Sequence, residues 1–189
     1  IENYTYSDMQ NQINKLQKEY DTLEVNSIGK SVSGRLLYQL QLGDGNKKIL
    51  VIGGIHGREG ITSLLTLKII EDYLFHKKMN QLIANYNPVK ILNRVTFCFI
   101  PMLNPDGIEI AVNGIKGFKN KDYLIKANEG SRDFRRWKAN ARGVDLNKQF
   151  KADWEDVVSR SEPHYSDYKG EYPESEPESR AIADLTREK

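Results

Sequence analysis

Two short apolar runs with a helical pattern between them constrain the fold of this 189-residue chain most strongly. The runs Lys48 to Ile52 and Val95 to Met102 are nearly continuous in apolar residues, which is typical of strands buried on both faces. Between them, Ile61 to Phe75 carries leucines and isoleucines at helical spacing. The order strand, helix, strand predicts an α/β fold with a mixed, mostly parallel central sheet and helices on both faces, and Lys48 to Ile52 is expected as a buried central strand.

The remaining segments add elements around this centre. Tyr6 to Tyr20 has an amphipathic helical pattern with Ser7 available as its cap, and Leu23 to Ile28 and Leu36 to Leu42 alternate as strands do. Asn113 to Gly170 is polar, aromatic and irregular, and we expect it to form a wall of a site. Ser175 to Lys189 reads as a helix with a proline near its first turn.

Composition excludes some classes of protein. With 39% hydrophobic residues the chain fits one domain with a core of ordinary size. A net charge of +2 gives no argument for nucleic-acid binding. No apolar stretch approaches the roughly 20 residues of a membrane-spanning helix.

A histidine and a glutamate follow the first apolar run and two glycines. His56 and Glu59 stand three residues apart, and zinc accepts imidazole nitrogen and carboxylate oxygen while keeping a position open for water. By itself this spacing is a weak signal, since it arises often by chance. Asn104 to Gly107 follow the second run, so both motifs should lie beyond the carboxyl ends of strands, where ligands gather in such sheets.

The order of three motifs resembles the zinc carboxypeptidases of the carboxypeptidase A type. These are His56-Gly57-Arg58-Glu59, Asn104-Pro105-Asp106-Gly107 and Arg142-Gly143-Val144-Asp145-Leu146-Asn147-Lys148. The segments Ile28 to Arg35 and Arg136 to Asn140 are similar to the bacterial branch of γ-D-glutamyl-diamino acid endopeptidases. The resemblance covers nearly the whole chain.

The resemblance implies a role for each matching position. It makes His56 and Glu59 zinc ligands, and Asn147 and Lys148 the pair that binds the substrate carboxylate. The family has arginine where Lys148 stands, and lysine lacks the planar fork that grips a carboxylate with two hydrogen bonds.

Three further positions have expected roles. Lys138, with Arg136 as the alternative, matches the family arginine that stabilises the oxyanion. Asp145 is expected either to orient His56 through its second ring nitrogen or to be a loop residue.

Simpler interpretations hold for other polar residues. His76 ends a predicted helix beside two lysines, where a histidine complements the helix dipole. His164 is expected at the surface of a loop, and Asn104 to Gly107 is expected to be chiefly a turn.

The resemblance also implies residues that this chain does not contain. In the family a third zinc ligand, a histidine, and a general-base glutamate follow at positions that would lie beyond Lys189. We therefore expect residues 1–189 to be the N-terminal portion of a single zinc peptidase domain, incomplete at its C-terminus. Such a chain would bind zinc weakly, lack activity alone and expose a sheet edge that favours self-association.

Three functions remain open from the sequence. The first is a zinc metallopeptidase that cleaves γ-D-glutamyl-diaminopimelate peptides of the bacterial cell wall, which implies a cell-envelope or sporulation setting. The second is an ordinary metallocarboxypeptidase that releases C-terminal amino acids. The third is a non-catalytic peptide-binding module that retains the peptidase fold.

Overall fold

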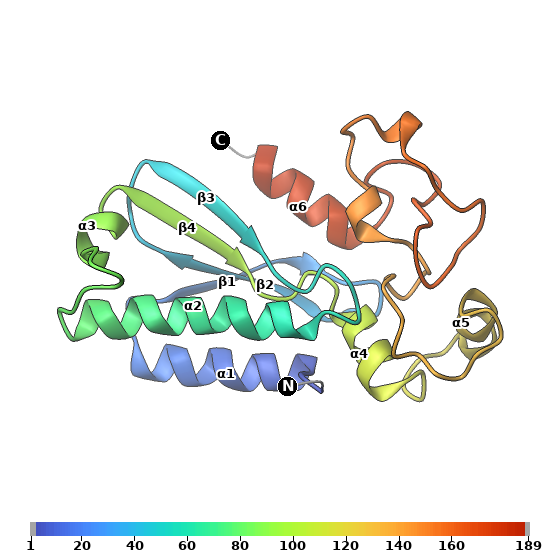
Figure 1. The fold of residues 1–189 in the computed structure, drawn as a ribbon, viewed down its shortest axis with the longest axis horizontal. Helices are drawn as coiled ribbons and strands as arrows, with labels where there is room; N and C mark the ends of the chain where they lie inside the picture. Colours follow the sequence, from blue (N-terminus) through green and yellow to red (C-terminus); the bar gives the residue numbers. More distant parts are fainter. Residues whose placement is uncertain (1–2, 188–189) are drawn as a thin grey trace.

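A four-stranded sheet lies at the middle of the computed structural model, which describes residues 3–187 (Figure 1). The chain enters through a helix, builds three strands, and adds the fourth strand after a long helix and a short one. In order the elements are α1 Tyr6–Glu19, β1 Glu24–Lys30, β2 Leu36–Leu42, β3 Lys47–Ile52, α2 Gly60–Lys78, α3 Pro88–Leu92, β4 Val95–Ile100, α4 Pro105–Asn113, α5 Lys121–Ala127, the 3-10 turns η1 Leu146–Lys148 and η2 Trp154–Asp156, and α6 Pro177–Arg187.

The sheet is mixed, with strand order β1-β2-β4-β3. β3 runs parallel to β4, whereas β2 is antiparallel to both β1 and β4. The predicted α/β class and the mixed sheet are confirmed. Parallel pairing does not predominate in the part of the chain that the structure describes, because only the connection from β3 to β4 contains the helical crossover that parallel neighbours require.

Helices cover both faces of the sheet, as predicted. Met9 and Ile13 of α1 share one apolar core with Leu67 and Ile70 of α2. On the other face, Ile182 of α6 belongs to a second core, and Figure 1 shows α6 separated from α1 and α2 by the strands. No helix in residues 3–187 is both long and apolar enough to cross a bilayer.

Helix α1 begins at Tyr6, as expected, but its N-cap is not the expected residue. Thr5, and not Ser7, is its N-cap: the Asp8 backbone N–H donates to Thr5 Oγ1 at 3.2 Å, and the Thr5 N–H donates to Asp8 Oδ2 at 2.9 Å. This reciprocal capping box satisfies two backbone donors, which a serine one residue inside the helix does not do.

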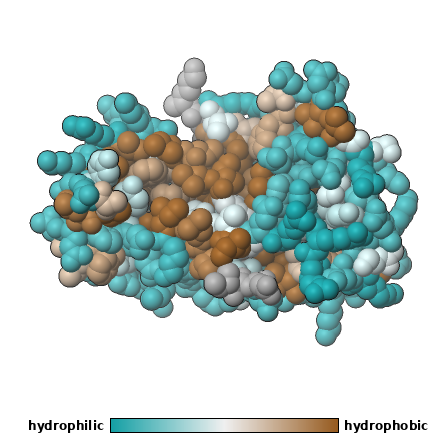
Figure 2. Space-filling view, in the orientation of Figure 1, coloured by the Kyte–Doolittle hydropathy of each residue, from teal (hydrophilic) through white to brown (hydrophobic). Residues whose placement is uncertain are grey.

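Strand β3 is the outer strand of the sheet, so the expectation of a buried central strand is wrong for the described residues. It pairs with β4 alone, and Ile49 and Ile52 are 42% and 36% exposed. Leu65 of α2 is also exposed, and Figure 2 shows apolar residues gathered on this face between α2 and α6. Self-association through this edge stays a prediction.

The start of α6 is anchored by a buried glutamate, Glu178. Its Oε1 accepts the Val32 N–H at 3.0 Å, and its Oε2 lies 3.4 Å from Asn140 Nδ2. The pKa of Glu178 is raised to about 7, chiefly by burial and less by the nearby carboxylates of Asp106 and Glu176, against the opposing effect of the backbone N–H groups. Glu178 therefore ties α6 to the β1–β2 turn largely as a neutral acid.

Glu178 should make stability fall as pH rises from about 4.5 to about 7. In that window the unfolded chain releases the proton while the folded chain keeps it, so folding is favoured less at higher pH. The expected loss is on the order of 3 kcal/mol. Glu178→Gln keeps an acceptor for Val32 and should flatten the pH dependence of urea unfolding. The exposed control Glu24→Gln should retain it, and equal slopes in both variants would contradict this assignment.

Candidate metal centre

His56 and Glu59 lie in the turn that follows β3. The turn is fixed to the end of β4, because the Gly53 N–H donates to Ile100 O at 2.8 Å and the Asn104 N–H donates to Gly54 O at 2.8 Å. His56 Nδ1 lies 3.0 Å from each carboxylate oxygen of Glu59. An imidazole nitrogen and a carboxylate therefore converge on one point at the carboxyl end of the strand.

The second nitrogen of His56 faces Asp145. Nε2 lies 3.3 Å from Asp145 Oδ1, an ion-pair distance at an angle that does not make a regular hydrogen bond. Asp145 is buried and also accepts the N–H groups of Asn147 and Asp167, each at 3.2 Å. The carboxylate is therefore held in place independently of the histidine.

The charges of His56 and Asp145 support each other. The pKa of His56 is raised, first by its contact with Asp145 and less by Glu59, against the opposing effect of burial. Burial alone would raise the pKa of Asp145, but His56 and the two backbone N–H groups hold it below its usual value. The sequence left two interpretations of Asp145, and the structure places it where an orienting partner of His56 would stand.

These residues fit part of a zinc site. A zinc-bound histidine uses one ring nitrogen for the metal and gives the other to a carboxylate or carbonyl, and His56 has that arrangement with Glu59 on one side and Asp145 on the other. Among residues 3–187, no group of three or more histidine, cysteine or acidic side chains is placed to hold a metal ion. The described residues thus supply two converging donors.

Asn104 joins the segments around the site. Its Nδ2 lies within 3.2 Å of the carbonyl oxygens of Ile55, Lys138 and Ala139, and its Oδ1 accepts the Gly107 N–H at 2.8 Å. Asn104 is the N-cap of α4, so the expectation that Asn104 to Gly107 is chiefly a turn is wrong. The motif begins a helix because its proline occupies the first turn, where no backbone donor is lost.

Asp106 of the same motif is also structural. Its buried carboxylate binds Arg35 Nη1 at 2.6 Å and accepts bonds from Ser31 Oγ and the Ser33 N–H. The motif therefore connects α4 to the β1–β2 turn.

The two candidate oxyanion stabilisers have different surroundings. The Arg136 guanidinium binds Asn128 O and Glu129 Oε2, both at 3.0 Å, and lies over the Tyr165 ring. Lys138 is partly buried, and its ammonium makes no ion pair within residues 3–187, while its backbone carbonyl accepts the Gly57 N–H at 2.9 Å. This difference favours Lys138, and its role stays a prediction.

Asn147 and Lys148 follow Asp145 in η1. Asn147 is exposed, and its N–H donates to Asp145. Lys148 Nζ donates to Val158 O at 2.8 Å and lies 3.8 Å from Asp167 Oδ1, so its charge is partly engaged within the loop. Binding of a substrate carboxylate by this pair stays a prediction.

The other two histidines stand apart from His56. His76 is half-buried in the last turn of α2 and contacts Asp72 O at 2.8 Å, in keeping with a helix-end position. His164 is buried, with Nε2 3.2 Å from Glu129 Oε1 and Nδ1 3.0 Å from Ser166 O. The prediction that His164 is a surface residue is therefore wrong, because the loop folds back on the segment after α5.

Asn140 and Glu176 were missed as contributors to the site. Asn140 is fully buried, its Oδ1 accepts the N–H groups of Arg142 and Val144 at 2.9 and 3.1 Å, and its Nδ2 donates to Glu176 Oε2 at 2.7 Å. Together they shape the loop that leads into Asp145. In the sequence, the one local sign of these contacts is the acidic pair in Ser175-Glu176-Pro177-Glu178, a pattern that by itself predicts only the start of a helix.

Gly57 should not tolerate a side chain. A Cβ atom at Gly57 would lie 2.4 Å from Gly107 O and 2.8 Å from Trp137 O, and both are backbone atoms that cannot rotate away. Gly57→Ala should lower the free energy of unfolding by about 1–3 kcal/mol or more. The matched control Gly117→Ala, where a Cβ meets open space, should cost far less in the same urea titration. Equal losses would contradict the close approach.

Comparison with known proteins agrees with this geometry. Residues 9–189 match the model of the zinc carboxypeptidase family. The chain is 39% identical to γ-D-glutamyl-L-diamino acid endopeptidase 1 of Lysinibacillus sphaericus over 98% of its own length and 48% of that protein. It is 29% identical to human carboxypeptidase A6, covering 97% of this chain and 39% of that one.

Solved structures share the fold. Thrombin-activatable fibrinolysis inhibitor superposes with a TM-score of 0.75 at 23% identity, over 97% of this chain and 43% of that one. Carboxypeptidase A from Helicoverpa armigera gives a TM-score of 0.68 at 25% identity, over 96% and 41% of the two chains. The chain thus spans about half the length, or less, of these relatives. The family match covers nearly all of its own residues, and the protein belongs to the zinc carboxypeptidase family.

Proposed function

We propose that the protein is a zinc-dependent metallopeptidase that hydrolyses a peptide bond next to a free carboxylate. The observation that carries the proposal is the convergence of His56 Nδ1 and the Glu59 carboxylate, with Asp145 facing the opposite ring nitrogen at an ion-pair distance. Membership in the zinc carboxypeptidase family supports zinc as the ion. We further propose that residues 1–189 are the N-terminal portion of a single peptidase domain.

The residues of this chain have distinct tasks in the proposal. His56 and Glu59 hold zinc, which when bound lowers the pKa of a water molecule and polarises the substrate carbonyl. Asp145 keeps the His56 ring turned so that Nδ1 faces Glu59. Asn147 and Lys148 bind the carboxylate of the substrate, and Lys138 offers a positive charge to the developing oxyanion.

The preferred substrates in this proposal are γ-D-glutamyl-diaminopimelate peptides of the bacterial cell wall. The support is the 39% identity to an enzyme whose name specifies γ-D-glutamyl-L-diamino acid endopeptidase activity. An ordinary carboxypeptidase activity is the second candidate, because carboxypeptidases stand among the relatives.

Substrate choice can be tested with two peptides. The protein at its natural length should cleave a γ-D-Glu-diaminopimelate peptide at least about tenfold faster, in kcat/KM, than a plain peptide ending in lysine or phenylalanine. The matched plain peptide controls for general carboxypeptidase activity. Cleavage of the plain peptide alone would sink the cell-wall substrate, and cleavage of neither would favour a binding module.

The 189-residue chain produced by itself should show no measurable peptide hydrolysis. The physical reason is that a zinc-bound water needs a proton acceptor, and the family resemblance places that glutamate beyond Lys189. Such an acceptor typically contributes a factor of about 100 to 10,000 in rate. A folded chain, checked by circular dichroism, that hydrolyses either peptide would contradict this expectation.

Asp145→Asn should weaken zinc binding about 10- to 100-fold at the natural length of the protein. The amide keeps the size of the carboxylate but loses the charge that orients His56. Competition with a chromophoric chelator measures the affinity directly. Asp44→Asn, at an exposed position before β3 and so at the opposite end of that strand from His56, is the control, and equal affinities of the two variants would remove Asp145 from the site.

A further inference from the structure

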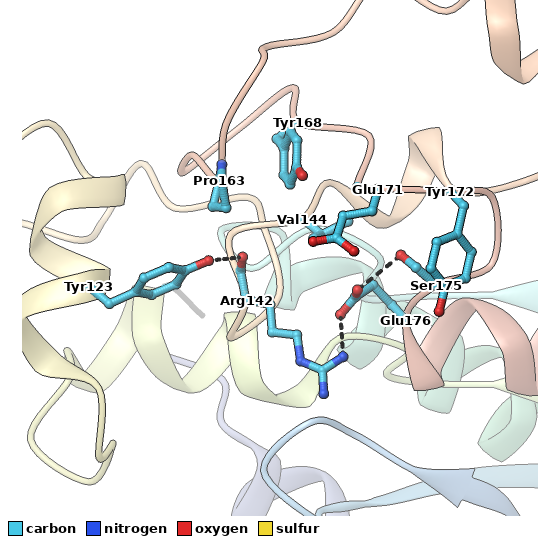
Figure 3. Close-up of a pocket in the computed structure, with 10 residues that line it drawn as sticks. Tyr123, Arg142, Val144, Pro163, Tyr168, Glu171, Tyr172, Ser175 and Glu176 are labelled. Carbon is cyan, nitrogen blue, oxygen red and sulfur yellow. Dashed lines mark hydrogen bonds and ion pairs between the residues drawn. The ribbon is translucent and has the colours of Figure 1, made fainter.

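A cavity of about 290 Å³ opens beside the loop that carries Asp145 (Figure 3). It lies among α5, the loop around Tyr168 and the start of α6, and its size is near the lower end of the range for small-molecule sites. Its lining includes two glutamates, one arginine and three tyrosines: Glu171, Glu176, Arg142, Tyr123, Tyr168 and Tyr172.

The acidic part of the cavity is fixed by buried hydrogen bonds. Glu176 is 4% exposed, accepts Asn140 Nδ2 at 2.7 Å and Ser175 Oγ at 3.1 Å, and lies 3.6 Å from Arg142 Nη1. Glu171 makes no ion pair in the described part of the chain. Figure 3 shows both carboxylates turned toward the middle of the cavity, with the Arg142 guanidinium beside them.

The charges in the cavity are opposite in sign but unequal. Two carboxylates face one guanidinium, and the Arg142 side chain is 55% exposed, so donors remain for a ligand anion. An added ammonium group would balance the excess carboxylate. A ligand with both an ammonium and a carboxylate would satisfy the two signs together.

The tyrosines supply neutral donors and flat walls. Burial raises the pKa of Tyr168, and Glu171 and Glu176 raise it further, so its hydroxyl stays protonated at neutral pH. Tyr123 is anchored at one side by its hydroxyl, which donates to Arg142 O at 2.8 Å. A polar ligand with a short apolar stem fits such walls.

The loop that lines the cavity also carries the residue that faces His56. Val144 lines the cavity, and the next residue, Asp145, faces His56. A wall of the cavity and the partner of His56 are therefore consecutive residues of one loop.

We propose that this cavity binds the zwitterionic head group of an amino acid, with its ammonium at Glu171 and Tyr168 and its carboxylate at Arg142. The assignment rests on the proposed peptidase function in one respect, which is that the ligand is the free end of a diamino dicarboxylic acid in the substrate. It explains how the protein would distinguish such a residue from one with an uncharged side chain.

Calorimetric titration of the zinc-stripped protein at its natural length tests the site without a contribution from metal binding. meso-Diaminopimelate should bind saturably. Pimelate, which lacks the ammonium groups, and cadaverine, which lacks the carboxylates, should each bind at least about tenfold more weakly.

Three variants locate the binding. Glu171→Gln and Arg142→Gln should each raise the Kd for diaminopimelate about tenfold or more. Glu155→Gln removes the same charge at an exposed position outside the cavity and should leave the Kd unchanged. Tyr168→Phe keeps the ring and removes the hydroxyl, and it should weaken binding by a smaller factor. Circular dichroism of each variant confirms that it is folded.

Two results would overturn the inference. They are equal binding of diaminopimelate, pimelate and cadaverine, and an unchanged Kd in folded Glu171→Gln. Absence of saturable binding to the folded protein would also overturn it. Peptide hydrolysis without diaminopimelate binding would contradict the cavity proposal and leave the peptidase proposal standing. Diaminopimelate binding without hydrolysis would support the cavity proposal and contradict the peptidase proposal.

Discussion

The side chain of Asn104 is the contact on which the site depends. One amide group binds carbonyl oxygens from the His56 turn and from the segment at Lys138 and Ala139, while its oxygen caps α4. Because the Asn104 side chain is fully buried, water cannot reach these donors and acceptors, and the protein itself must supply their hydrogen-bond partners. The position of His56 relative to Lys138 follows from this convergence of backbone segments, whereas Asp145 meets His56 through its own side chain.

The region around the site contains four buried carboxylates, and each is neutralised differently. Asp106 is paired with an arginine, and Asp145 faces a histidine and receives backbone N–H groups. Glu176 receives an asparagine amide and lies near Arg142, while the raised pKa of Glu178, about 7, keeps it protonated in mildly acidic solution. Buried charge of one sign is costly unless it is paired or discharged.

The periodic elements could be predicted from the sequence, and the site only in part. Apolar spacing placed the strands, α1, α2 and α6 within a few residues, because core burial imposes a local repeat on each element. The edge position of β3 was not predictable from its composition, since an apolar run does not say which neighbours it has. His56, Glu59 and Asp145 were recognisable from motifs, and the structure brings them together. The contacts of Asn140 and His164 depend on residues far away in sequence and leave no local pattern.

The exposed edge of β3 links the candidate metal centre to strand pairing at that edge. The strand that ends in the His56 turn is supported on one side only, by β4. In the proposed metallopeptidase, a strand that pairs with this free side and favours the zinc-bound geometry of the turn would raise the affinity for zinc. By thermodynamic reciprocity, zinc held by His56 would strengthen the pairing at the edge by the same factor. In the proposed metallopeptidase, pairing at the β3 edge and zinc affinity would therefore change together.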